Sequence, residues 1–238
     1  MNHIMKIRIG KKKISKGRTF FVAEMSANHN GSLKKAKEII KKAKIAGADA
    51  IKLQTYSADS ITINSNKKDF RLTHKSASPW KKYKNFYQLY KKASTPLSWH
   101  KELFSYAKKN SIEIFSSPFD LDSVDFLENL DCVAYKIASP EITHVPLLKK
   151  VAKTNKPIII STGVAKLSDI KLAIKIVKEN GNKKIILLKC DSSYPAEISN
   201  SNLPGIRYLS EKFKVLVGYS DHTKGSSSAV ASLMLGSV

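Results

Sequence analysis

Apolar and polar residues follow one repeated pattern along the chain: a short apolar run, a polar turn, and an amphipathic stretch with apolar residues at i, i+3, i+4 and i+7. The apolar runs predict seven strands, at residues 20–26, 50–56, 113–119, 132–139, 157–163, 184–192 and 214–222. The amphipathic stretches predict helices at 33–46, 99–110, 122–130, 146–154, 167–180 and 203–213. Because the runs are apolar rather than alternating, they fit the doubly buried strands of a parallel sheet.

Polar residues follow nearly every predicted strand. In an open sheet, ligand groups gather at one switch point, whereas in a TIM barrel every strand can contribute from its carboxyl end. The distribution favours an α/β fold of the TIM (β/α)8-barrel type. After the seventh strand come a small-residue helix at 226–235 and what resembles the start of an eighth strand, Gly236-Ser237-Val238. Since a missing strand would leave two open sheet edges, we expect an incomplete barrel that lacks its C-terminal part.

Two segments depart from the repeat. Residues 57–80 are polar and show no clear periodicity, and a loop of that length is usually functional or disordered. Residues 1–18 predict a short hairpin with lysines at its turn, serving as a plug or an edge strand before the barrel. We therefore expect an N-terminal hairpin at 1–18 and a barrel domain at 19–238.

The composition, 42% hydrophobic and 8% aromatic, is typical of a globular protein. No stretch approaches the roughly 18 uncharged apolar residues of a membrane helix, and no apolar signal region follows the basic N-terminus. Cys132 and Cys190 both lie in apolar, strand-like runs. Two cysteines without a secretory context predict reduced thiols and a cytoplasmic protein.

The net charge of +23 could attract nucleic acid or an anionic surface. However, 38 of the 42 basic residues are lysine, whereas nucleic-acid readers rely on arginine for bidentate contacts. The lysines fall mainly on the polar sides of helix patterns, as in KKAKEIIKKAK. We interpret the charge as a solvated surface, and we expect neither nucleic-acid nor membrane partners.

Two lysines, Lys52 and Lys136, lie inside apolar strands, in AIKLQTY and AYKIAS. A buried lysine is costly unless it is paired or faces a polar cavity. One interpretation is a structural ion pair with Glu24 or Glu141. The other is a cationic pocket for an anionic substrate, which two such lysines on different strands favour.

Hydroxyl side chains follow three of the strands, at Ser117, Ser139 and Ser161. Singly, such serines commonly cap helices. Together, and beside two lysines, they could form a phosphate cradle with helix N-terminal amides. The absence of Gly-x-Gly-x-x-Gly and Walker motifs argues against dinucleotide or nucleoside-triphosphate binding.

His222 ends the seventh predicted strand in GYSDHT, with Ser220 on the same face by period-two alternation. A strand-end histidine in a polar cluster is a candidate metal ligand or acid–base group, although a single histidine is more often structural. His29 is the other histidine that follows a predicted strand.

Seven segments resemble, in order and spacing, the N-acetylneuraminate/pseudaminate synthase family: AEMSANHNGS, AGADAIKLQTY, FSSPFD, AYKIASPEIT, PIIISTG, LLKCDSSYPAE and VGYSDHT. They extend from about residue 20 to the end of the chain. Each segment is weakly specific alone, and the seven in register are highly specific. The forms KLQTY, TPLSWH and KCDSSYPAE are more similar to the pseudaminate branch than to the N-acetylneuraminate branch.

The resemblance implies roles for the strand-end residues. Phosphoenolpyruvate would be bound by Lys52, Ser117, Lys136, Ser139, Ser220 and also Ser192, which stands where the N-acetylneuraminate branch has asparagine. The sugar would be faced by Gln54, Glu141 and Tyr194. Glu24 would lie near the reacting carbons and, with Lys52 and Lys136, form the catalytic set. His222 would be one of two histidine ligands to a divalent ion, usually Mn²⁺ or Mg²⁺.

In the chemistry that the resemblance implies, the metal polarises the aldehyde of an open-chain amino sugar. Carbon 3 of phosphoenolpyruvate attacks that aldehyde, water adds at carbon 2, and phosphate leaves by C–O cleavage. The product would be pseudaminic acid, made from a sugar of the 2,4-diacetamido-2,4,6-trideoxy-L-altrose type. Synthesis of N-acetylneuraminate or legionaminate is the alternative within the family.

The resemblance also implies parts that residues 1–238 do not contain. The family's second metal histidine lies on the eighth strand in a Glu-Lys-His context. A C-terminal antifreeze-like domain supplies an arginine to the partner subunit's site in a homodimer. We therefore expect this chain to be an inactive fragment.

Two hypotheses of other classes remain open. A Schiff-base barrel aldolase would use Lys136 or Lys52, because barrel aldolases also place lysine on a strand. A non-catalytic basic binding protein would explain the net charge instead.

Overall fold

The computed structural model describes residues 6–72 and 82–238. The chain forms two compact units. One comprises Val22–Asp131, and the other comprises Cys132–Val238 together with the N-terminal segment that ends at Phe21. We call them the 22–131 unit and the C-terminal unit.

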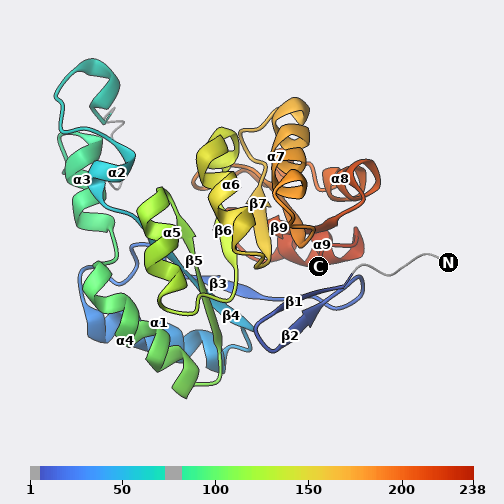
Figure 1. The fold of residues 1–238 in the computed structure, drawn as a ribbon, viewed down its shortest axis with the longest axis horizontal. Helices are drawn as coiled ribbons and strands as arrows, with labels where there is room; N and C mark the ends of the chain where they lie inside the picture. Colours follow the sequence, from blue (N-terminus) through green and yellow to red (C-terminus); the bar gives the residue numbers. More distant parts are fainter. Residues whose placement is uncertain (1–5, 73–81) are drawn as a thin grey trace. The chain divides into compact units, whose positions relative to one another are not determined.

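Three parallel strands form the sheet of the 22–131 unit, in the order β3 (Val22–Glu24), β4 (Ala50–Thr55) and β5 (Glu113–Pro118). Two helices, α1 (Leu33–Ile45) and α4 (Leu97–Lys109), pack side by side and contact β4 and β5 respectively (Figure 1). Helix α5 (Leu121–Glu128) follows β5. The apolar face of α1 buries Ala36, Ile40 and Ala43, as expected for an amphipathic helix that covers a sheet.

The connection between β4 and α4 is more structured than the polar sequence predicts. It contains α2 (Ala58–Ile61), the 3₁₀ turn η1 (Lys68–Phe70) and α3 (Phe86–Ala93). The polar sequence predicts a loop at residues 57–80, and no helix is predicted at α3. Of the predicted loop, residues 73–80 lie outside the described residues. Helix α3 is only 8 residues long, which is shorter than the window of about 11–18 residues over which apolar periodicity identifies a helix.

Four parallel strands form the sheet of the C-terminal unit, in the order β6 (Tyr135–Ile137), β7 (Ile158–Ser161), β8 (Ile185–Cys190) and β9 (Leu216–Ser220). Most of their residues are buried, as the unbroken apolar runs predict. Helices α6 (Val145–Lys153) and α7 (Leu167–Glu179) pack against each other (Figure 1). The remaining helical segments are η2 (Ser139–Thr143), η3 (Ile198–Asn200), α8 (Gly205–Phe213) and α9 (Ser227–Met234).

The described residues therefore contain seven parallel strands that alternate with helices, and this confirms the predicted α/β class. Several strands are shorter than their apolar runs. β6 occupies only Tyr135–Ile137 of the predicted 132–139, because Ser139 already begins the 3₁₀ helix η2. This shortening matters for function, since it places Ser139 at a helical turn rather than within a strand.

The N-terminal segment forms an antiparallel hairpin of β1 (Ile7–Ile9) and β2 (Lys12–Ile14). Ile9 pairs with Lys12, so the turn is Gly10-Lys11 rather than a pair of lysines. Gly10 has a φ of 53°, a left-handed conformation in which glycine carries no side-chain penalty.

The residues that follow α9 run beside β9. The Val238 N–H donates to the Val217 carbonyl at 3.1 Å. Residues 236–238 are predicted to begin an eighth strand, but they form no strand in the structure, and this hydrogen bond connects them to β9. Among residues 6–72 and 82–238, no helix combines the length and apolar character that a membrane crossing demands.

Candidate functional site

The predicted site residues fall into two groups, one in each unit. Glu24, Lys52, Gln54 and Ser117 lie on β3, β4 and β5 of the 22–131 unit. The larger group belongs to the C-terminal unit and comprises Lys136, Ser139, Glu141, Ser192, Tyr194, Ser220 and His222. Each group lies at or near the carboxyl ends of parallel strands, which is where side chains from successive strands can meet.

Strand register brings the first group together. Glu24 is the register partner of Lys52, and Gln54 is the partner of Ser117. The Lys52 ammonium forms an ion pair with the Glu24 carboxylate, which also accepts a hydrogen bond from the Ser26 N–H at 3.1 Å. The Lys52 side chain is only 11% exposed, so the pairing offsets its loss of hydration. The structural ion pair that the sequence left open for Lys52 is therefore present.

Ser116 and Ser117 are neighbours in the chain, but their hydroxyl groups differ in hydrogen bonding. Ser116 Oγ lies 2.6 Å from Thr55 Oγ1, whereas Ser117 Oγ is buried and has no hydrogen-bond partner among the described residues. A buried hydroxyl without a partner calls for an explanation, and a bound ligand or water is the usual one. Ser117 is thus available for a ligand, as the resemblance implies.

Lys136 acts electrostatically on both Glu141 and His222 in the C-terminal unit. Burial raises the pKa of the Glu141 carboxyl, and its own backbone N–H and the positive charge of Lys136 oppose the rise. The charge of Lys136 also acts to lower the pKa of His222. Glu141 Oε2 is buried without a hydrogen-bond partner among the described residues. These side chains therefore share one polar region.

Four residues form what we call the glycine cradle: Ser139, Gly163, Cys190 and Ser192. The Gly163 N–H donates to Ser139 Oγ at 2.9 Å. A Cβ added at Gly163 would lie 3.1 Å from Ser139 Oγ and 3.2 Å from Cys190 Sγ, and it would also collide with Ser192 Oγ. Three polar atoms from the ends of β6 and β8 thus surround a position that only glycine can occupy without displacing them.

Both ring nitrogens of His222 have partners. His222 Nδ1 lies 2.6 Å from the Asp191 carbonyl, so Nδ1 must carry the proton that this bond requires. In the neutral ring, Nε2 then accepts a hydrogen bond from the Tyr194 hydroxyl, 3.0 Å away. The two rings pack with centroids 4.2 Å apart. Tyr194 is 67% exposed, so it covers His222 from the solvent side.

Cys190 was not among the predicted site residues, yet it lies at the centre of this group. Its Sγ is 3.9 Å from His222 Nδ1. Burial raises the pKa of the Cys190 thiol, but hydrogen bonding by His222 and the nearby hydroxyls of Ser161 and Ser220 outweighs burial and lowers the pKa to about 7. Ser161 Oγ favours the thiolate by proximity, although it lacks a partner with good hydrogen-bond geometry. Hydrogen bonding to Cys190 in turn raises the pKa of His222.

Like the other candidate residues, Cys190 lies at the end of a predicted strand. That position is the one feature of the sequence that could have identified it as a site residue. From the sequence, Cys190 is predicted only to be a reduced thiol. Gly163 was likewise visible in PIIISTG, but nothing in its local sequence indicates that three polar groups would converge on it.

The described residues do not complete a metal site. They contain no group of three or more His, Cys, Asp or Glu residues placed to hold an ion. His222 could offer Nε2 to a metal only after the Tyr194 hydroxyl had left it. The Mn²⁺ or Mg²⁺ ion therefore remains a prediction.

Comparison with known proteins places the chain in a family. The NeuB family profile matches residues 39–238. The chain is 46% identical to the pseudaminic acid synthase of Campylobacter jejuni over 219 residues, which cover 92% of this chain and 63% of that protein. It is also 46% identical to the pseudaminic acid synthase of Helicobacter pylori, covering 90% of this chain and 62% of that protein. The chain thus spans less than two thirds of the length of these relatives.

Solved structures agree with this relationship. The N-acetylneuraminic acid synthetase of Leptospira borgpetersenii matches 98% of this chain and 76% of its own, with a TM-score of 0.84 and 30% identity. The spore coat polysaccharide biosynthesis protein SpsE of Bacillus subtilis matches 98% of this chain and 62% of its own, with a TM-score of 0.82 and 33% identity. The likeness agrees with the predicted TIM-barrel type of fold. The chain belongs to the NeuB family.

Proposed function

We propose that this chain is the catalytic barrel portion of an enzyme that condenses phosphoenolpyruvate with an N-acetylated amino sugar and water to give a nonulosonic acid and phosphate. The observation that carries the proposal is the glycine cradle beside Lys136, Glu141 and His222, in a chain 46% identical to pseudaminic acid synthases. The cradle supplies small hydroxyl groups and a backbone position without a side chain. Lys136 supplies the positive charge that a phosphate or carboxylate needs.

The acceptor that we propose is of the 2,4-diacetamido-2,4,6-trideoxy-L-altrose type, which would make the product pseudaminic acid. Identity to a Campylobacter N,N'-diacetyllegionaminic acid synthase is lower, 41% over 222 residues. This difference in sequence identity supports the pseudaminate branch. The legionaminate and N-acetylneuraminate reactions are the alternatives.

The residues of this chain suit the charge changes of such a reaction. The new bond joins carbon 3 of phosphoenolpyruvate to the sugar aldehyde carbon, whose oxygen takes up a proton. Positive character then develops at carbon 2, where water adds and loses a proton. Collapse of that tetrahedral centre to a ketone breaks the C–O bond and releases phosphate. Fixed groups aimed at developing charge stabilise such steps most, because they need no reorganisation.

We assign each group of residues a part in that sequence. Lys52, Ser117, Lys136, Ser139, Ser192 and Ser220 would bind the phosphate and carboxylate groups of phosphoenolpyruvate. Gln54, Glu141 and Tyr194 would contact the sugar. Glu24, whose carboxylate pairs with Lys52, would accept the proton of the attacking water. A divalent ion, when bound, would supply Lewis-acid activation of the aldehyde.

Phosphate release tests the proposal. The product of the complete reading frame is assayed with phosphoenolpyruvate, Mn²⁺ and the three candidate sugars, and Lys136→Met serves as the inactive control. We expect phosphate only when a sugar is present. With ¹⁸O in the bridging C–O–P position, the label should appear in phosphate. Absence of phosphate with every sugar contradicts the proposal, and a borohydride-trapped adduct with pyruvate would favour the Schiff-base aldolase instead.

Two further properties belong to this proposal. We expect the complete protein to be a homodimer, which light scattering in solution would measure. We also expect it to reside in the cytoplasm, where phosphoenolpyruvate is available, which fractionation of cells would measure. A monomeric active enzyme would contradict the first expectation.

A further inference from the structure

A buried hydrogen-bonded column crosses from helix α4 to the sheet of the 22–131 unit. His100 Nδ1 lies 3.1 Å from the Pro96 carbonyl, and His100 Nε2 lies 3.0 Å from Thr55 Oγ1. Thr55 Oγ1 in turn lies 2.6 Å from Ser116 Oγ. His100, Thr55 and Ser116 are each 0% exposed. The His100 ring also meets the Phe126 ring of α5 edge-on, with centroids 5.4 Å apart.

The proton positions in this column follow from its ends. A carbonyl can only accept, so Nδ1 of His100 carries the hydrogen and donates it to Pro96. Burial lowers the pKa of His100, which keeps the ring neutral and makes Nε2 an acceptor. Thr55 must therefore donate to Nε2, and Ser116 must donate to Thr55. All the hydrogen bonds of the column therefore run in the same direction, from Ser116 to the Pro96 carbonyl, and both hydroxyl groups donate their protons within it.

The column lies directly behind the predicted ligand-binding face. Leu53 pairs with Ser116 in the β4–β5 register, and Gln54 pairs with Ser117. Side chains alternate between faces along a strand, so Thr55 and Ser116 share the helix-facing side while Gln54 and Ser117 share the opposite side. Ser116 is committed to the column, whereas Ser117 Oγ, one residue on, is buried without a partner.

We propose that His100 is a positioning residue: through Thr55 and Ser116 it holds the carboxyl ends of β4 and β5 in one alignment, so that Gln54 and Ser117 present their polar groups to the substrate. The inference rests on the proposed function. Apolar side chains could fill this layer without hydrogen bonds, whereas a directional polar column specifies a single arrangement of the two strands. If Ser117 Oγ is held in place before the substrate binds, less conformational entropy is lost on binding, and the affinity is higher.

Matched variants separate positioning from stability. Thr55→Val keeps the side-chain shape and removes the hydroxyl, and Thr55→Ser keeps the hydroxyl. Thr95→Val is the control, because Thr95 Oγ1 makes a comparable buried bond of 3.2 Å to His29 Nε2 but contacts neither strand end of the column. In the complete protein, phosphoenolpyruvate affinity is measured by calorimetry and thermal stability by Tm. Ser116→Ala is the substitute if Thr55→Val does not fold.

We expect both valine variants to lower Tm by similar amounts. Only Thr55→Val should weaken phosphoenolpyruvate binding, by about threefold to tenfold, as expected for the loss of roughly one net hydrogen bond. Thr55→Ser should restore it. Unchanged affinity in Thr55→Val overturns the inference, as does a failure of Thr55→Ser to restore binding.

Two further results keep this inference separate from the proposed function. If the wild-type protein does not bind phosphoenolpyruvate, the proposed substrate is wrong and the positioning role falls with it. The ¹⁵N spectrum of the His100 ring provides an independent test that needs no ligand. We expect the neutral tautomer with hydrogen on Nδ1, and hydrogen on Nε2 would overturn the column as described.

Discussion

Gly163 shows how much of the candidate site depends on a missing side chain. Its N–H binds Ser139 Oγ, and its Cα faces Ser192 and Cys190. Its φ is not in the left-handed region, so alanine could adopt the same backbone conformation without strain. The requirement for glycine here comes from close approach of polar atoms and not from the backbone.

Gly163→Ala should therefore impair ligand binding more than folding. The new methyl group would displace Ser192 and crowd Ser139, so we expect the KM for phosphoenolpyruvate to rise by about tenfold, equivalent to roughly 1.4 kcal/mol. Steady-state kinetics of the complete enzyme measure the change. Gly205→Ala is the control, because a methyl there meets only the flexible Lys189 side chain. An unchanged KM in Gly163→Ala would remove the cradle from the substrate site.

At the scale of single elements, some residues of the family segments serve the fold instead of the chemistry. Asp120, the last residue of FSSPFD, is the N-cap of α5, and its Oδ1 accepts a hydrogen bond from the Ser123 N–H at 2.6 Å. Ser32 and Asn85 cap α1 and α3 in the same way. The presence of Asp120 in the family segment is thus explained by its role as a helix cap, and it needs no role in the chemistry.

Replacing that cap should cost stability. For Asp120→Ala we expect a loss of about 1 kcal/mol in the free energy of unfolding, because the Ser123 N–H loses its partner. Asp120→Asn keeps an acceptor and should recover most of the loss. Chemical denaturation measures both. Equal stability of the alanine and asparagine variants would contradict a capping role.

Two buried histidines in the described part of the 22–131 unit, His29 and His100, make its stability depend on pH. Burial lowers the pKa of both His29 and His100 below the ordinary value of 6.5. The unfolded chain therefore binds more protons than the folded chain once the pH falls below about 6.5, so stability is full above that value and declines as the solution is acidified.

Denaturation midpoints at pH 7.5 and pH 5.5 test this dependence. We expect a lower midpoint at pH 5.5, and a smaller difference when His29 and His100 are both replaced by glutamine. His222 acts in the opposite direction, since its pKa is raised, so His222→Gln should enlarge the difference. A double glutamine variant with the full wild-type difference would show that other groups are responsible.

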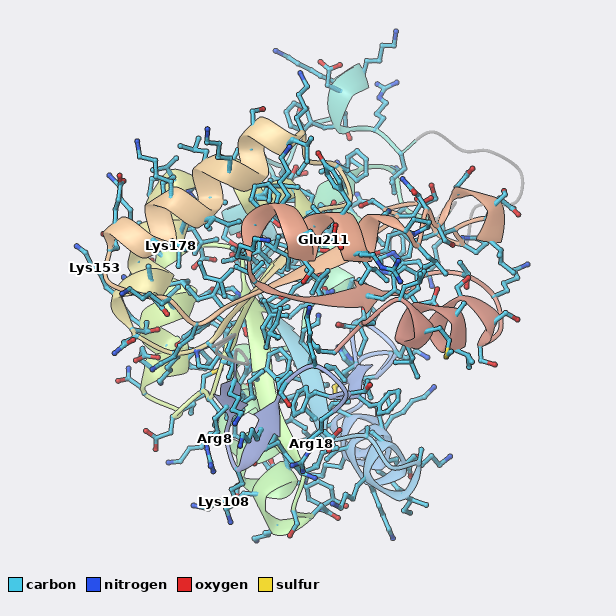
Figure 2. All side chains as sticks on the ribbon, turned by 90° about the vertical axis from the view of Figure 1, so that its right-hand side faces the viewer. Arg8, Arg18, Lys108, Lys153, Lys178 and Glu211 are labelled. Atoms are coloured by element: carbon cyan, nitrogen blue, oxygen red, sulfur yellow. The ribbon has the colours of Figure 1, made fainter. Side chains whose placement is uncertain are left out.

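At the scale of the whole molecule, the charge of +23 comes mainly from lysines, and most of the lysines that the structure describes are exposed. Figure 2 shows Lys153 of α6 and Lys178 of α7 extending away from their helices. Flexible ammonium groups of this kind attract polyanions without the bidentate geometry by which arginine reads bases. We interpret them as a solvated surface.

Retention on immobilised DNA should accordingly be weak and independent of sequence. We expect it at low salt and expect it to vanish at about 0.15 M salt, because screening and counterion release remove most of the attraction. Elution from a DNA column over a salt gradient measures it. Firm retention at physiological ionic strength would favour the basic binding protein that the sequence left open.

The sequence alone determined the α/β class, the seven strands and the carboxyl-end location of the candidate residues. These features depend on the spacing of apolar residues and on local turns, which short segments carry by themselves. The same local rules missed α3, whose 8 residues are too few for apolar periodicity to identify a helix.

Only the tertiary structure decided which polar groups meet. It paired Lys52 with Glu24 through the β3–β4 register, and it separated the committed Ser116 from the unpartnered Ser117. It also brought Cys190 to His222, a residue 32 positions away in the chain. The physical reason is that partner choice depends on strand register and on close packing between distant segments, and a shift of one residue would turn every side chain to the other face.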